Sequence, residues 1–396
     1  MPTPLARLAC PQPRNFWRSA LCRSPDGTLF LARAESHTLY VFRAEPWATL
    51  QYTFQAPSPV LDVCWYMYPA ISDDNVVHWC FAVSCRDMPV RLVDAVDGTT
   101  KASFGIVNHV ESFLAPQALA FSSDCVRLFG GLSEACTVHS LADAGTNRHA
   151  ALALAASQHG LVSALAVGRA PHDLEEENGA PLEITAVGTY ANVVGIYVTD
   201  ASWLHSAAER DEAGRHGAKE IVQGGALCLA GWRVNEGHGI VQMQWHPKHR
   251  HILVVGMRRA SYVYVYNTSY LSGTGTPFQR APALLARLER PCANSHQRLL
   301  FDIDAEGRFL VAGDARGTIR IWDLEYVLRA DTDVPSPLLA WNAHTDAIGS
   351  TQFCPQKPQC VLSVAGARHW DTTTQGPLPT DTDAVLWQWP RPADTH

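Results

Sequence analysis

The sequence predicts an all-β fold arranged as a seven-bladed β-propeller, and three observations support this prediction. Short runs of alternating apolar and polar residues, the period of half-buried strands, recur along the chain. One unit of three such runs is repeated seven times. Hydrophobic residues make up 47% of the 396 residues and charged residues only 17%. A low charged fraction is expected for a chain that is mostly buried sheet.

The clearest copy of the unit runs from Arg298 to Glu325. Its first two runs are separated by the turn Ala305–Gly307, and the turn Asp314–Gly317 precedes the third run. A second copy, Ser19–Glu45, contains the sequence Ser-Pro-Asp-Gly, which is a strong turn signal. These are the turns that antiparallel strands require.

A bulky residue, most often aromatic, marks the third run of each repeat. The spacing of these residues exceeds the about 40–45 residues of a minimal WD40 repeat, because the repeats carry insertions that we interpret as solvated loops. Such insertions cover residues 172–180, 210–219 and 372–383, and a helix within residues 207–220 is left open. The marker residues are Phe42, Val93, His139, Tyr197, Tyr266, Trp322 and Trp387.

The repeats fill the chain, so we predict one WD40 propeller over residues 1–396. Each repeat supplies three strands, and the segment that leads to the next repeat would supply the fourth, outer strand. We expect the N-terminal segment, residues 1–14, to form the outer strand of the last blade and close the ring. The repeats span about residues 15–45, 59–104, 108–143, 158–200, 237–268, 296–325 and 341–389.

The composition restricts the expected cellular compartment and the expected kinds of binding partner. The net charge of −7 argues against a generally basic nucleic-acid coat protein, although a local basic site is compatible with it. The sequence has neither an apolar run long enough for a transmembrane helix nor a signal-peptide core, so we expect an intracellular protein. Eleven cysteines without a CxxC pair indicate reduced thiols rather than a zinc site.

Signatures of catalysis are absent from the sequence. It contains no GxSxG, P-loop, HExxH or dinucleotide fingerprint. Propeller hydrolases use carboxylates around the central channel, but the first runs contain only Asp62 and Asp302, which are not part of a repeated pattern. We therefore predict a protein that is not an enzyme and that needs neither a cofactor nor a metal.

Binding is better supported than catalysis. In a propeller blade, the loop that leads into the first strand (the incoming loop) and the turn between the second and third strands open on the same face. Arginine forks suit phosphate, and loop aromatics can stack on unpaired bases, so a single-stranded RNA loop is the expected ligand. The residues of this rim are Asn15, Phe16, Trp17, His37, Arg86, His109, Gln158, His159, His238, Arg258, Arg259, Gln297, Arg298, Arg316, Trp341, His344, Arg368 and His369.

Several rim residues also have a structural interpretation. Arg86 could form a surface ion pair with Asp87, and Phe16 and Trp17 could pack beneath the rim. Arg258 has a second arginine and no acid beside it in the sequence, which makes it the best candidate for ligand contact. A histidine in an incoming loop can instead brace the third-strand tryptophan and a turn aspartate. The histidines left open in this way are His109, His238 and His344.

Five segments in a consistent order resemble the telomerase Cajal body protein family, with its WD40 domain. They are Asn15–Trp17, Leu61–Tyr66, Ser84–Ala95, Lys101–Glu111 and His296–Gly313. The resemblance covers nearly all of the chain, and the motifs R-D-x-P, N-H-V-E and Q-R-x-x-F-D lie on the expected rim rather than in the repeat consensus. The literal Trp-Asp pair occurs only once, at Trp322.

The resemblance implies a nuclear protein that binds a loop element of small nuclear or small Cajal-body RNA, and of telomerase RNA in animal members. It implies a place in the Cajal body or nucleoplasm, with the cytoplasm as a further location, and ribonucleoprotein proteins as partners. We expect a monomer that binds neither DNA nor membrane. The alternative is a protein-interaction scaffold, for example in splicing or small nuclear ribonucleoprotein complexes, without RNA contact. The predicted RNA-binding residues are Phe16, Arg86, His109, Arg258, Gln297 and Arg298, with Arg316 added as a phosphate contact.

Overall fold

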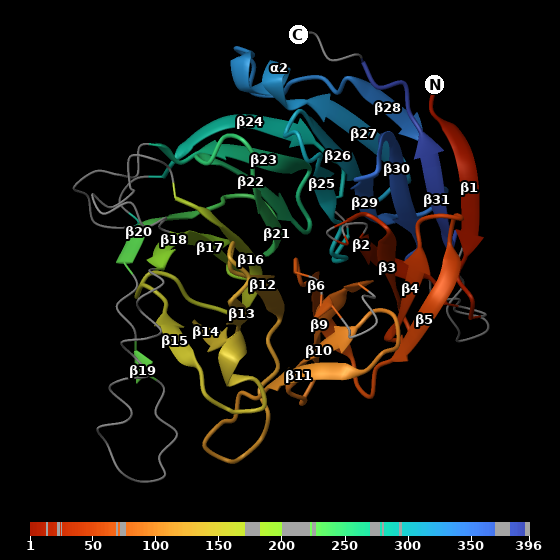
Figure 1. The fold of residues 1–396 in the computed structure, drawn as a ribbon. Helices are drawn as coiled ribbons and strands as arrows, with labels where there is room; N and C mark the ends of the chain where they lie inside the picture. Colours follow the sequence, from red (N-terminus) through yellow and green to blue (C-terminus); the bar gives the residue numbers. More distant parts are fainter. Residues whose placement is uncertain are drawn as a thin grey trace, which may run out of the picture.

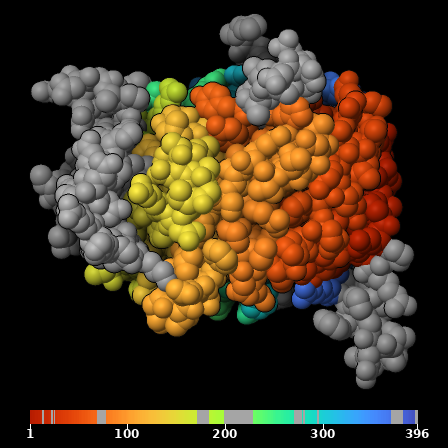
Figure 2. All heavy atoms as spheres, turned by 60° about the horizontal axis from the view of Figure 1, so that its bottom comes forward, coloured from red at the N-terminus to blue at the C-terminus, as the bar shows by residue number. Residues whose placement is uncertain are grey.

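The chain forms a seven-bladed β-propeller with almost no helix, which confirms the predicted fold class (Figure 1). The computed structural model describes residues 1–12, 15–21, 24, 26–68, 70–71, 77–170, 183–199, 222–223, 227–269, 278, 281–292, 295–368 and 381–392. Seven mainly antiparallel sheets surround a common axis in chain order. The outer surfaces of the first three blades follow one another as a continuous wall in Figure 2.

Each of the first six blades contributes four strands that run in chain order from the axis outward. Blade 1 contains β2 (Trp17–Leu21), β3 (Leu29–Ala34), β4 (Thr38–Arg43) and β5 (Thr49–Gln55). Blade 2 contains β6 (Val60–Trp65), β9 (Cys80–Cys85), β10 (Val90–Asp94) and β11 (Thr100–Phe104). Blade 3 contains β12 (Ala118–Phe121), β13 (Arg127–Gly131), β14 (Ala135–Ser140) and β15 (Ala150–Ala153), with β19 (Val222–Gln223) added in parallel at its edge.

Blades 4 to 6 follow the same order. Blade 4 contains β16 (Val162–Arg169), β17 (Glu183–Thr189), β18 (Val193–Thr199) and β20 (Leu227–Arg233). Blade 5 contains β21 (Ile240–Trp245), β22 (Ile252–Met257), β23 (Tyr262–Asn267) and β24 (Ala283–Glu289). Blade 6 contains β25 (Phe301–Ile303), β26 (Phe309–Gly313), β27 (Thr318–Asp323) and β28 (Leu339–Asn342). Each outer strand comes from the segment that leads to the next repeat.

Both ends of the chain build blade 7. Its inner strands are β29 (Ile348–Cys354), β30 (Lys357–Ala365) and β31 (Asp383–Gln388), and β1 (Thr3–Ala9) pairs antiparallel with β31 as the outer strand. Ser350 Oγ donates a hydrogen bond of 3.0 Å to the carbonyl oxygen of Ala20, so blade 7 is bonded directly to blade 1. The N-terminal strand thus occupies the position expected for a segment that closes the ring (Figure 1).

The marker residue of each repeat lies in the third strand and is buried in every blade. None of the seven is more than 6% exposed. In blade 1, the ring of Phe42 stacks on Phe30 with centroids 5.0 Å apart and meets the edge of Trp17 at 6.0 Å. Burying a large apolar side chain contributes roughly 1.5–3 kcal/mol. His139 substitutes for an aromatic residue in blade 3, and burial lowers its pKa to about 3, so it packs as a neutral ring.

Polar side chains at matching positions of the inner strands tie neighbouring blades together. Asp302 in blade 6 accepts a hydrogen bond of 3.0 Å from the backbone amide of Phe353 in blade 7. Equivalent bonds to Asp62 and Gln242 come from the amides of Leu119 and Phe301, both at 2.8 Å. The two acids that the first strands contain therefore brace the ring.

Smaller elements decorate the connections. They are β7 (Ala70–Ile71), β8 (Val77–His78), the 3₁₀ turn η1 (Leu141–Asp143) and the helix α2 (Leu324–Arg329), which Asp323 caps by accepting bonds from the amides of Glu325 and Tyr326. The insertions expected at 172–180, 210–219 and most of 372–383, and the helix considered within 207–220, lie outside the described residues. The described cysteines form no disulfide, and no helix in the described part could span a bilayer.

Candidate nucleic-acid interface

Backbone hydrogen bonds bring the incoming loops and the turns between second and third strands together on one face of the ring. The amide of Arg86 donates to the carbonyl oxygen of Pro59 at 2.9 Å. The amide of Arg258 donates to Gly239 at 3.1 Å, and that of Ala343 donates to Gly317 at 2.9 Å. These bonds recur around the ring, so the residues of the two loop classes form one rim, as the repeat geometry predicts.

Two of the predicted RNA-binding arginines, Arg86 and Arg316, are exposed on this rim. Within the described part of the chain, neither guanidinium forms an ion pair, including the one considered between Arg86 and its neighbour Asp87. The turn that holds Arg316 is built by Asp314, whose Oδ1 accepts the Arg316 amide at 2.8 Å. The other oxygen of Asp314 pairs with Arg320 at 2.6 Å, so this carboxylate is already neutralised.

Arg258 is held in a fixed orientation by an aromatic ring. Its guanidinium lies 4.2 Å from the ring centroid of Tyr190, and its Nε donates to the carbonyl oxygen of His238. A guanidinium stacked on a ring keeps its remaining N–H groups directed outward. The role of Tyr190 is not evident from the sequence, because a lone tyrosine in a turn carries no signal of its partner.

The loop that carries Gln297 and Arg298 crosses toward the centre of the ring. Gln297 Nε2 donates to the carbonyl oxygen of Gly366 at 2.9 Å, which braces this loop against blade 7. Buried Arg290 fixes the start of the loop by donating to the carbonyl oxygens of Leu299 at 2.7 Å and Met257 at 3.0 Å. Gln297 therefore has a structural partner, whereas Arg298 extends further toward the axis.

Arg298 reaches backbone carbonyls on three other blades. Its guanidinium donates to Leu61 of blade 2, Ser163 of blade 4 and Val241 of blade 5, at 3.1–3.4 Å. Because a blade 6 residue can meet the inner strands of blades 2 and 4 only across the axis, Arg298 lies over the mouth of the central channel. Its Nη1 is also 3.7 Å from a carboxylate oxygen of Asp62.

Two further arginines at the channel were not found from the sequence. Arg18 lies in the inner strand β2, and Arg33 lies in β3. Arg33 donates to the carbonyl oxygens of Val60 and Leu61 of blade 2. One signal existed: Arg18 follows buried Trp17, and strand alternation places consecutive side chains on opposite faces.

The three aromatic residues that the sequence places on the rim are buried and do not face solvent. Phe16, Trp17 and Trp341 are only 3%, 0% and 7% exposed, respectively. Trp17 lies within β2 and Trp341 within the outer strand β28, while Phe16 packs beneath Gly366, where an added Cβ would lie 2.4 Å from the Phe16 Cβ. The packing interpretation is thus confirmed for Phe16 and Trp17, and Phe16 cannot stack on a base in this conformation.

The histidines separate into two groups. His344 is structural: its Nε2 lies 2.7 Å from Ser363 Oγ and its Nδ1 lies 3.1 Å from Asp381, while Trp387 Nε1 donates to the same serine at 2.8 Å. Although burial opposes ionisation, bonds from His344 and the Thr345 amide lower the pKa of Asp381 to about 2. This is the bracing network that was considered for rim histidines.

His109 and His238 are exposed on the rim, and neither ring has such a network among the described residues. His109 lies at the tip of a loop that Asn108 shapes, because its Oδ1 accepts the amides of Val110 and Ser112 at 3.0 Å each. Three apolar side chains of this loop are also exposed: Val110 (62%), Phe113 (38%) and Leu114 (39%). The rim therefore offers both cationic and apolar contacts.

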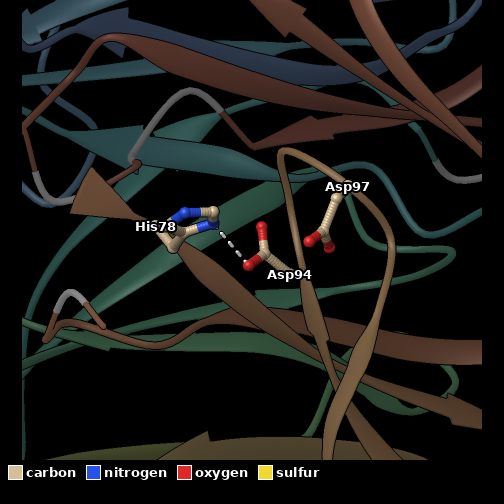
Figure 3. Close-up of side chains that lie close together, drawn as sticks. All are labelled: His78, Asp94 and Asp97. Carbon is tan, nitrogen blue, oxygen red and sulfur yellow. Dashed lines mark hydrogen bonds and ion pairs between the residues drawn. The ribbon is translucent and has the colours of Figure 1, made fainter. Parts of the chain in front are cut away.

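The one group of potential metal ligands in the described residues lies away from this rim. His78, Asp94 and Asp97 place their ligand atoms within 4.8 Å of one another (Figure 3). Lys101 Nζ lies 3.1 Å from Asp94, however, and Thr99 donates two hydrogen bonds to Asp97. His78 Nδ1 lies 2.7 Å from Asp94 Oδ2, so these carboxylates already have protein partners.

The chain is similar over most of its length to curated telomerase Cajal body proteins. No protein-family model matches the chain. Telomerase Cajal body protein 1 of Homo sapiens is 26% identical over 383 residues, covering 92% of this chain and 59% of the human protein. The Mesocricetus auratus protein of the same name is 25% identical, covering 89% and 58%. Guanine nucleotide-binding protein negative regulator 1 of Schizosaccharomyces pombe is 25% identical, covering 78% and 71%.

The similarity covers only part of each telomerase Cajal body protein. The chain spans about three-fifths of the length of the curated telomerase Cajal body proteins that it matches. The alignments cover about nine-tenths of this chain, so most of the propeller is matched. The chain is thus a WD40 propeller that resembles the telomerase Cajal body proteins over nearly its full length, as its motifs predicted.

Proposed function

We propose that this protein is a non-catalytic WD40 scaffold that binds a loop of small nuclear or small Cajal-body RNA on its rim and assists ribonucleoprotein assembly or nuclear localisation. One observation carries the proposal. Arg86, Arg258 and Arg316 lie on one face, and none of them pairs with a carboxylate among the described residues. Telomerase RNA is a further candidate ligand, because relatives that match about nine-tenths of this chain are named for telomerase and the Cajal body.

The expected mechanism is electrostatic capture. The three rim arginines and Arg298 would contact phosphates, and exposed His109 and His238 would contact bases. The structure changes one part of this mechanism, because buried Phe16 is not available for stacking. Gln297 would act indirectly by bracing the loop that carries Arg298.

The test is ultraviolet crosslinking of the full chain in cells, followed by RNA sequencing. The proposal predicts enrichment of a small set of nuclear RNAs with crosslinks in single-stranded loops. Recovery of RNA in proportion to cellular abundance, with no loop preference, would contradict it.

A second candidate is a protein-interaction scaffold on the same rim. The exposed apolar loop around His109 favours it, because Val110, Phe113 and Leu114 would suit a peptide better than a phosphate backbone. Co-purification after nuclease treatment separates the two functions. A partner set that survives nuclease favours the peptide scaffold, whereas its loss favours RNA.

A further inference from the structure

Four arginines from three different blades converge at the mouth of the central channel. Arg18 and Arg33 come from blade 1, Arg298 from the incoming loop of blade 6, and Arg368 from the turn after β30 of blade 7. We call these four residues the channel arginines. They are far apart in sequence, and only the closed ring places them together.

Shared acceptors show how close these side chains are. Arg33 Nη1 and Arg298 Nη1 each donate to the carbonyl oxygen of Leu61 at 3.4 Å. Glu35 is shared in the same way: its Oε2 lies 2.9 Å from Arg18 Nε, and its Oε1 pairs with Arg368. The four guanidiniums therefore form two adjacent pairs around one opening.

The positive charge at this opening is not fully balanced. The carboxylates in contact with the cluster among the described residues are Glu35 and Asp62, which leaves a formal excess of two positive charges. Burial and, to a smaller extent, the neighbouring Arg18 and Arg298 lower the pKa of Arg33 to about 10, so it remains charged at neutral pH. Holding like charges together is costly unless an anion offsets them.

Unused hydrogen-bond donors and open access complete the site. The Nε groups of Arg33 and Arg298 are buried and have no acceptor in the described part of the chain. Arg18 and Arg298 keep 35% and 29% of their side-chain surface exposed, so an anion can approach from the rim. Planar guanidinium forks with free donors match the oxygens of phosphate better than a single carboxylate.

The geometry points to a ligand for the channel arginines: they would bind one internucleotide phosphate of the RNA that the rim captures. This inference rests on the proposed function, and it adds Arg18 and Arg33, whose positions on strands make them part of the rigid ring. The rim would capture the loop, and the channel mouth would fix its register by seating a single phosphate.

The first experiment tests the anion site without RNA. Thermal unfolding of the full chain is followed with and without inorganic pyrophosphate, for the wild type, Arg18→Gln, Arg298→Gln and Arg329→Gln. Arg329 is an exposed helix arginine outside the rim and provides a charge-matched control. Pyrophosphate should raise the midpoint of the wild type and of Arg329→Gln, and should raise the other two much less. Equal shifts in all four proteins, or none in any, would overturn the inference.

The second experiment uses synthetic copies of the RNA recovered by crosslinking, all with hydroxyl ends. In each copy, one phosphate linkage is replaced by a neutral methylphosphonate. One linkage should weaken binding of the wild type about tenfold, as expected for a charged hydrogen-bonded contact, while the others have small effects. Arg18→Gln should lose this position dependence, and Arg33→Lys, which keeps the charge, should retain part of it. Uniform effects along the RNA would overturn the inference.

The outcomes also separate the inference from the proposed function. If the wild type binds RNA and Arg18→Gln binds it with the same affinity and salt dependence, the channel assignment is wrong and the rim proposal stands. If pyrophosphate stabilises only proteins with intact channel arginines but no RNA binds, the RNA assignments of both rim and channel are wrong.

Discussion

At the residue scale, the orientation of each arginine side chain depends on the residues that contact it. Arg258 is aimed by the ring of Tyr190 and by one carbonyl oxygen of the adjacent loop. Arg298 is carried to the axis by a loop that buried Arg290 anchors. Such partners come from other blades or loops, so a single sequence does not reveal them.

We predict that Arg258→Ala weakens RNA binding about tenfold, because a charge-assisted contact to phosphate is lost. Tyr190→Phe keeps the ring under the guanidinium and should bind like the wild type. Tyr190→Leu should fall between them, since the arginine remains but is no longer oriented. Equilibrium binding by fluorescence anisotropy measures all three. An Arg258→Ala protein with wild-type affinity would remove Arg258 from the site.

The Asp381 carboxylate predicts a pH dependence of stability. Its pKa of about 2 in the folded protein lies below the ordinary value of 3.8, despite burial, because His344 and Thr345 donate to it. A lowered acid pKa stabilises the fold above about pH 4, and this contribution is lost as the pH falls toward 2. The stability difference between wild type and Asp381→Asn should therefore shrink between about pH 4 and pH 2. Urea midpoints that differ equally across this range would contradict the prediction.

At this scale the sequence was informative about residue class and less so about exposure. Period-two alternation located the buried third-strand positions, from Phe42 to Trp387, because burial there follows from strand position alone. The sequence left packing and ligand contact both open for Phe16, because its burial depends on Gly366 of another blade. Arg33 was missed because its partners Val60 and Leu61 lie on another blade. The one signal for Arg18, its position after buried Trp17, was not used.

At the element scale, tight turns on the rim depend on glycine. Gly317 has a φ of 85°, and a Cβ added there would lie 2.0 Å from the carbonyl oxygen of His344. Gly145 has a similar φ of 83° but open space around it. Gly317→Ala should cost about 3 kcal/mol or more of unfolding free energy, against roughly 1–2 kcal/mol for Gly145→Ala from backbone strain alone. Denaturant titration compares the two, and equal losses would show that the close approach is unimportant.

The outer strand of blade 7 is the second test at this scale. β1 pairs with β31 along its length, and Trp17 Nε1 donates to the carbonyl oxygen of Leu8 at 3.3 Å. Deleting residues 1–12 should lower the melting temperature by more than about 5 °C, because several backbone hydrogen bonds and the ring closure are lost. Leu5→Ser should have little effect, since that side chain is 51% exposed. An unchanged melting temperature of the deletion would show that β1 does not close the ring.

For the whole molecule, the repeats were sufficient to predict the ring. Seven copies of a three-strand unit, each completed by the following segment, leave one strand to be supplied from the start of the chain, and β1 occupies that position. Channel geometry was beyond the sequence, because it depends on how seven inner strands meet. A net charge of −7 thus coexists with arginines gathered on one face.

The most direct measurement is the salt dependence of RNA binding by the full chain. With the crosslinked RNA, the logarithm of the association constant should fall linearly with the logarithm of salt concentration. The variant with Arg86, Arg258 and Arg316 all changed to Ala should bind more weakly, with a slope smaller by about 2, since each single-strand phosphate contact contributes about 0.7.

The charge-matched control changes Arg7, Arg43 and Arg329 to Ala. Arg7 lies in the outer strand β1, Arg43 at the end of β4 and Arg329 in α2. The control should keep the wild-type affinity and slope. The same slope for the rim variant and the wild type, or an equal loss in the control, would contradict RNA capture by the rim.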